Sequence, residues 1–167
     1  TYTVENIEDR YWDRSITTFY AGNVDKAIEY MEVYQVINPQ NALAFIRLGS
    51  YFYATGDNEK AIEYLEKSSK IYKEIGYKKG MAATWNNIGL IYGKLGEEEK
   101  ELEYYEKALF LAEGSGDKQN VARAYNNIGR LYRDQEKRAK AIYYFEKSLA
   151  ILMDIEYKLG IPYILTN

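Results

Sequence analysis

Amide and guanidinium side chains are concentrated in two segments of the chain that lie forty residues apart. The set comprises Asn86, Asn87, Arg123, Asn126, Asn127, Arg130 and Arg133. An amide both donates and accepts hydrogen bonds, so it can pair with a peptide backbone whatever the peptide's sequence. A guanidinium group binds a carboxylate through two parallel hydrogen bonds. These residue types therefore indicate recognition of a peptide that carries acidic groups.

Catalytic groups are scarce in this sequence. The chain has no His and no Cys, which removes the commonest general base and all thiolate chemistry. Gly114-Ser115-Gly116 follows no strand, so we interpret it as a linker between helices and not as a nucleotide-binding loop. The run Glu97-Glu98-Glu99 is interpreted as a solvated turn with favourable charge at a helix start. We expect no enzymatic activity, no cofactor and no metal site.

A repeated phrase spans the same two segments. Residues 85–92, WNNIGLIY, return as residues 125–132, YNNIGRLY, and Gly49 stands forty residues before Gly89. A second anchor follows each phrase, with Ala27, Ala61 and Ala141 in matching positions. A fixed period of this length is the signature of a repeat architecture.

These motifs resemble the tetratricopeptide repeat (TPR), whose pattern combines W-x2-L-G-x2-Y with A-x3-F and a following proline. The resemblance covers nearly the whole chain. It implies an all-α fold, a right-handed superhelical stack of antiparallel helix hairpins. We expect one TPR domain over residues 1–167, with repeats at about 8–41, 42–81, 82–121 and 122–161. Residues 162–167 are expected to begin a fifth repeat or a capping helix.

Apolar spacing and turn residues predict eight helices. The predicted ranges are about 4–20, 24–36, 42–54, 58–75, 79–94, 97–113, 118–134 and 138–156. Gly49, Gly89 and Gly129 fall inside helices, where glycine costs about 1 kcal/mol against alanine. We expect the paired helix to approach closely at these positions, which would offset that cost.

Three positions depart from the repeat pattern. Arg14-Ser15 replaces the expected Leu-Gly of the first repeat, which suggests an end cap or a less certain register. Glu101 replaces the small residue of the third repeat. A carboxylate in a tight helix crossing is costly, so either that hairpin should splay or Glu101 should reach a Lys or Arg. Glu136 replaces the turn glycine of the fourth repeat, and we expect that turn to differ.

The first helix of each repeat lines a concave, peptide-holding surface in the resembled family. That resemblance implies a peptide-binding role for Asn87 and Asn127 above all. The other members of the predicted site are Asn86, Asn126, Arg123, Arg130, Arg133, Arg47 and Lys94. The alternative is that the asparagines bond a neighbouring helix or face water, and that the arginines pair with Asp134 or Glu136. Trp12, Phe19 and Tyr53 would be apolar anchors for a ligand or packing residues.

We therefore predict a cytoplasmic, non-enzymatic scaffold that binds an extended, acidic peptide of a partner protein in its concave groove. The alternative is a regulatory or self-assembly module that controls an output domain or pairs through its C-terminal edge. A net charge of −3 gives no general reason to bind nucleic acid, and the short apolar runs predict no membrane segment.

Overall fold

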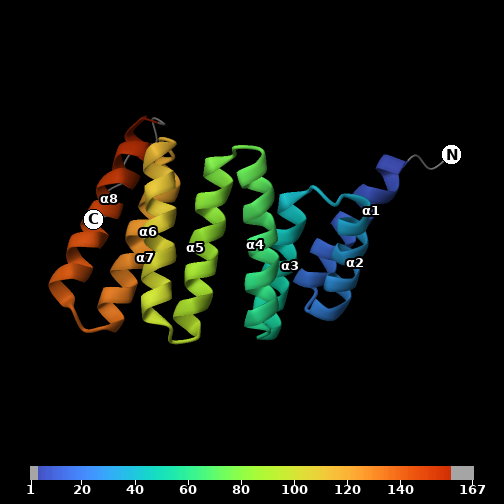
Figure 1. Cartoon of the computed structure of the whole chain (residues 1–167), viewed down its shortest axis with the longest axis horizontal. Helices are drawn as coiled ribbons and strands as arrows, with labels where there is room; N and C mark the ends of the chain where they lie inside the picture. The colour runs from blue at the N-terminus through green and yellow to red at the C-terminus, as the bar shows by residue number, and fades with distance from the viewer. Residues whose placement is uncertain (1–3, 159–167) are drawn as a thin grey trace, which may run out of the picture. The chain divides into compact units, whose positions relative to one another are not determined.

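The computed structural model describes the backbone of residues 4–158 and the side chains of residues 7–155. The chain divides into two compact units at Tyr77 and Lys78. The first unit contains two antiparallel hairpins, drawn blue to green in Figure 1. Its helices are α1 (Val4–Tyr20), α2 (Val24–Ile37), α3 (Ala42–Thr55) and α4 (Asn58–Glu74). Within this unit α1 packs on α2, α2 on α3, and α3 on α4.

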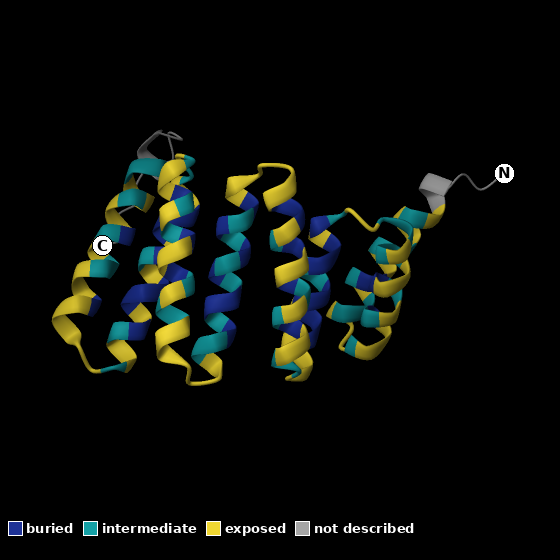
Figure 2. Cartoon of the chain, in the orientation of Figure 1, coloured by how far each residue is buried: buried dark blue, intermediate teal, exposed yellow. Residues whose placement is uncertain are grey.

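The second unit also consists of two antiparallel hairpins. Its helices are α5 (Lys78–Lys94), α6 (Glu98–Gly114), α7 (Lys118–Asp134) and α8 (Arg138–Lys158). Here α5 packs on α6 and α7 on α8, while α7 also contacts both α5 and α6. Figure 2 shows that buried residues lie on the faces that neighbouring helices share within each unit. The all-α arrangement of helix hairpins agrees with the sequence prediction, and each described helix end lies within two residues of its predicted position.

Short polar side chains and glycines set these helix ends. The side chains of Asn23, Asn41, Asp57 and Asp117 accept hydrogen bonds from backbone N–H groups of the first helical turn. At the α3 end, Gly56 adopts φ +86, a left-handed conformation that glycine reaches without a steric penalty. The residue types that mark these boundaries in the sequence therefore carry out the capping.

The helical glycines lie where the two helices of a hairpin approach most closely. A Cβ atom at Gly89 would lie 2.6 Å from Cε1 of Tyr105. The same construction places a Cβ of Gly129 2.8 Å from Phe145, and one of Gly49 2.9 Å from Leu65. The expected close approach is thus confirmed in three hairpins, and a large side chain of the second helix fills the space in each.

An aromatic pair also joins the two helices of each of these hairpins. Phe52 stacks on Tyr64 with ring centroids 5.3 Å apart, and Tyr92 stacks on Tyr104 at 5.4 Å. Tyr132 and Tyr144 repeat the arrangement at 5.5 Å. Lysine ammonium groups lie over the rings, for example those of Lys60, Lys100 and Lys140 at 5.0–5.1 Å from the ring centroids. Much of the high tyrosine content therefore serves packing.

Two of the three departures leave the repeat geometry unchanged. Ser15 is buried, and its hydroxyl donates to the carbonyl of Ala27 at 2.8 Å, so a small residue is kept in the glycine position. Glu136 adopts φ 59, the left-handed conformation of the glycines at the other turns. The backbone hydrogen bonds around it match those around Gly96. The expectation of a different turn was therefore wrong. Glu136 adopts a left-handed backbone conformation that is strained for a residue with a side chain.

Candidate functional site

The arginines and asparagines of α7 divide between its exposed and its buried face. Arg123, Asn126 and Arg130 are exposed, and their spacing of three and four residues places them on one side of the helix. The opposite side contains buried apolar residues such as Ala124 and Ile128, which anchor α7 in its unit. Neither Arg123 nor Arg130 forms an ion pair with any described residue. These three side chains are available to a ligand.

Asn127 faces the protein interior. It is buried, and its Nδ2 donates to Oδ1 of Asn86, which has no exposed surface, across 3.4 Å between α7 and α5. A second bond with the same spacing runs from Nδ2 of Asn120 to the carbonyl of Lys79, also 3.4 Å. Nδ2 of Asn86 has no hydrogen-bond partner. The asparagine pair thus joins two helices, as in the structural alternative considered for these residues.

The remaining predicted residues differ in their surroundings. Arg133 pairs with Asp134 at 2.8 Å, as the structural alternative anticipated. Asn87 is half-buried and Lys94 is exposed, both on α5. Arg47 belongs to the first unit, where its guanidinium lies 5.9 Å from the ring centroid of Trp12. Among the exposed predicted residues, Arg123, Asn126, Arg130 and Arg133 share helix α7.

The predicted aromatic anchors of the first unit are mostly engaged in packing. Trp12 contacts Tyr34, with ring centroids 5.0 Å apart, and Phe19 stacks on Tyr51 at 4.5 Å. Tyr53 is the most exposed of the three candidates. These contacts favour the packing role for Trp12 and Phe19.

Glu101 occupies a polar contact between α5 and α6 that the sequence prediction described only in part. Its carboxylate fills the space beside Gly93, where a Cβ would lie 2.5 Å from Oε1. Oε1 also accepts a hydrogen bond from the hydroxyl of Tyr105 at 3.1 Å. Neither expected alternative occurs, because the hairpin stays close at Gly89 and Glu101 has no ion pair with a described Lys or Arg. Gly93 of α5 has no side chain, and this leaves space for the carboxylate of Glu101.

Burial raises the pKa of Glu101 above its ordinary value. The hydrogen bond from Tyr105 lowers the pKa, Asp134 raises it, Arg130 lowers it, and Glu98 raises it, each by less than burial does. A signal for this contact was present in the sequence. The third repeat has Glu101 where other repeats have Ala61 and Ala141. It also has a glycine, Gly93, eight positions before Glu101, where those repeats have larger residues.

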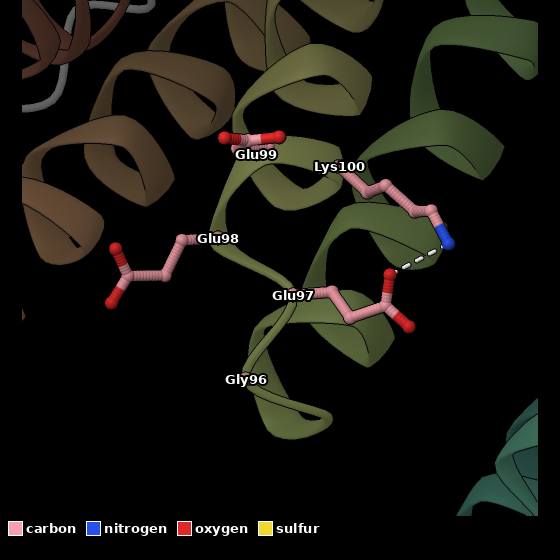
Figure 3. Close-up of a pocket in the computed structure, with 5 residues that line it drawn as sticks. All are labelled: Gly96, Glu97, Glu98, Glu99 and Lys100. Carbon is pink, nitrogen blue, oxygen red and sulfur yellow. Dashed lines mark ion pairs between the residues drawn. The ribbon is translucent and has the colours of Figure 1, made fainter.

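The acidic turn between α5 and α6 does not assemble a site. Figure 3 shows the carboxylates of Glu97, Glu98 and Glu99 pointing in different directions. Glu97 pairs with Lys100 at 2.6 Å, and Glu98 accepts from Nε2 of Gln135 at 2.8 Å. Among the described residues, no group of three or more metal-binding side chains is close enough to hold an ion. Nor is any described helix long and apolar enough to cross a membrane.

A family model of the tetratricopeptide repeat matches residues 40–113 and again residues 80–154. These matches cover more than half of the chain, which therefore belongs to the tetratricopeptide repeat family. Members of this family serve in general as protein-interaction scaffolds and not as enzymes. No curated protein sequence matches the chain.

Several solved structures share the fold of this chain. The crystal structure of MamA is 26% identical, with a TM-score of 0.70, and the match covers 90% of this chain and 81% of MamA. BtubC from P. vanneervenii is 19% identical, with a TM-score of 0.77, covering 91% of this chain and 65% of that protein. Aspartyl phosphate phosphatase F from Bacillus subtilis is 19% identical, with a TM-score of 0.79. That match covers 92% of this chain but only 41% of the phosphatase.

Proposed function

We propose that this chain binds an acidic segment of a partner protein on the exposed face of α7 that carries Arg123, Asn126 and Arg130. The observation that carries the proposal is the pair of arginines, which share one helix face and form no ion pair with a described residue. A guanidinium group is suited to bidentate carboxylate recognition. Membership of a family of interaction scaffolds supports the same function.

The asparagines contribute unequally to this proposal. Asn126 is exposed beside both arginines, so its amide can contact the ligand directly. Asn87 is half-buried and stays a proposed contact on α5. A ligand contact by Asn127 would require its hydrogen bond to Asn86 to break. We therefore assign recognition chiefly to Arg123, Asn126 and Arg130.

A binding screen with matched charge reversals tests the proposal. The full chain would be screened against a peptide array, and the peptides captured would be measured by fluorescence anisotropy with wild type and with the Arg123→Glu/Arg130→Glu variant. Acidic peptides should bind the wild type, and the double variant should lose at least about tenfold in affinity. The matched control is Arg138→Glu, another exposed arginine of the same unit outside this face. Equal affinity in all three proteins would contradict the proposal.

The alternative function is a regulatory or self-assembly module. One observation favours it, namely the exposed apolar side chains of α8, including Leu149 and Leu152. Such a module predicts that the chain self-associates as its concentration rises. Sedimentation equilibrium would measure this directly, and Leu149→Glu should abolish the association. A monomer at all concentrations would remove the support for self-assembly.

A further inference from the structure

Within the second unit, α5 shows how the face that carries Arg123, Asn126 and Arg130 on α7 is covered in the preceding repeat. On α5, the residues forty positions before Arg123, Asn126 and Arg130 are Ala83, Asn86 and Leu90. Asn86 is completely buried there, because helix α7 packs against α5. Both hydrogen bonds across this contact join a residue to the one 41 positions later. In the preceding repeat, the matching face of α5 is thus covered by a helix, α7.

The second helix of the repeat takes part in the same contact. On α6, Ala112 clusters with Val121 of α7, and Leu109 packs against that cluster. The residues forty positions later on α8 are Leu152 and Leu149, which are 44% and 54% exposed. Ile142, which matches the partly buried Leu102, is 56% exposed. Figure 2 shows α8 largely in the colours of exposed and intermediate residues. Polar groups on α7 and an apolar stripe on α8 therefore form one open surface.

The hydrogen-bonding capacity of this surface favours a helical ligand. Arg123 and Arg130 offer donors only, and Asn126 supplies the one side-chain carbonyl oxygen among the three. An extended peptide needs acceptors for its own N–H groups, and α7 and α8 use their backbone carbonyls within the helices. A helix satisfies its backbone internally and presents only side chains. The surface can therefore bury a helix without leaving backbone groups unpaired.

The charges indicate what that helix carries. With the 41-residue offset, Arg123, Asn126 and Arg130 face three ligand positions spaced by three and four residues. Acidic side chains suit the outer two positions, and an amide suits the middle one, as Asn127 does opposite Asn86. Residues 159–167 of the chain contain no Asp or Glu, so their composition does not complement the arginines. A partner protein with acidic side chains at these two positions would complement the arginines.

We propose, building on the function above, that the partner segment is an amphipathic α-helix lying across α7 and α8. It carries two acidic residues seven positions apart, an amide three positions after the first, and apolar residues that contact Leu149 and Leu152. Recognition of this kind buries the apolar face of the helix, and charged pairs at its edge fix the register.

The chain supplies its own template for a probe. A fluorescein-labelled peptide of residues 117–134 with Ala124→Glu and Leu131→Glu places glutamates opposite Arg123 and Arg130 and keeps Asn127 opposite Asn126. The unsubstituted peptide is the matched control. We expect the glutamate peptide to bind the full chain about tenfold more tightly, from two exposed charge pairs. Arg123→Glu/Arg130→Glu should remove this advantage, and Leu149→Glu should weaken both peptides. Arg138→Glu should change neither.

Further measurements separate the ligand's conformation from binding itself. An Ile128→Pro version of the glutamate peptide should lose binding, because proline breaks the helix, and transferred NOEs of the bound glutamate peptide should show helical contacts. Equal binding by the proline peptide, or extended NOEs, would overturn the helical ligand and leave acidic recognition standing. If no acidic peptide binds at all, the proposed function fails as well.

Two other occupants of the surface would also overturn the inference. The chain has no cysteine of its own, so within one molecule an Asn126→Cys/Asn167→Cys variant can form a disulfide only between these two positions. Ready disulfide formation in the monomer would mean that the chain covers its own surface. Self-association that Leu149→Glu abolishes would mean that a second copy does.

Discussion

Replacing Gly89 by alanine should destabilise the protein, although alanine is the better helix former. The propensity gain is about 1 kcal/mol. Against it, the new Cβ would lie 2.6 Å and 2.7 Å from two ring carbons of Tyr105, a residue that is only 1% exposed. Forcing extra volume into such a site costs roughly 1–3 kcal/mol, and the rigid ring puts this case near the upper end. The net loss should be about 1–2 kcal/mol.

Chemical and thermal unfolding monitored by circular dichroism measure this effect. For a chain of this size, a net loss of about 1–2 kcal/mol lowers Tm by about 2–8 °C. Gly114→Ala is the matched control, since Gly114 ends α6 and its Cβ would meet nothing within 4 Å. That variant should gain up to about 1 kcal/mol from propensity alone. If Gly89→Ala were as stabilising as Gly114→Ala, the close approach of α5 and α6 would be refuted.

Three further substitutions test individual contacts. Burial raises the pKa of Glu101, so the folded state holds its proton more tightly than the unfolded state, and stability falls as pH rises above the ordinary glutamate value. Glu101→Gln should therefore raise the urea midpoint at pH 7, with a gain that shrinks towards pH 4.5; a constant gain would contradict this cause. Glu136→Gly should add about 0.5–1 kcal/mol by relieving the left-handed strain, less the entropy cost of glycine, and an unchanged urea midpoint would argue against that strain. Asn127→Ala should cost about 1–3 kcal/mol because Asn86 loses its partner, whereas Asn126→Ala should stay within about 0.5 kcal/mol, and equal losses in thermal unfolding would exclude the buried pairing.

The helices could be predicted closely because their ends depend on local chemistry. Asn41 and Asp57 cap helices with their own side chains, and Gly56 takes a left-handed conformation that other residues resist. The close approach at Gly89 could also be predicted, since a mid-helix glycine needs a packing reason. Neither inference requires knowledge of distant parts of the chain.

The environment of the asparagines could not be predicted in the same way. Asn86 and Asn126 occupy equivalent positions in the shared sequence NNIG, yet the first is fully buried and the second exposed. The difference arises because α7 covers α5, while no described helix covers the same face of α7. A repeat sequence specifies the shape of each face but not which faces are occupied. Site residues on a repeat protein therefore have to be assigned by their neighbours.

The exposed face of α1 differs in composition from the open surface of α7 and α8 proposed above for docking. Val121, Ala124 and Ile128 of α7 are buried, and by the repeat register the matching positions of α1 hold Ile7, Arg10 and Arg14, all exposed. Arg10 and Arg14 thus place charge where α7 has small or apolar side chains. The open surface of α7 and α8 instead presents the apolar side chains of Leu149 and Leu152. Covering α1 would bury charge, whereas covering α8 removes apolar area from water, so an apolar helix face is directed to the second surface.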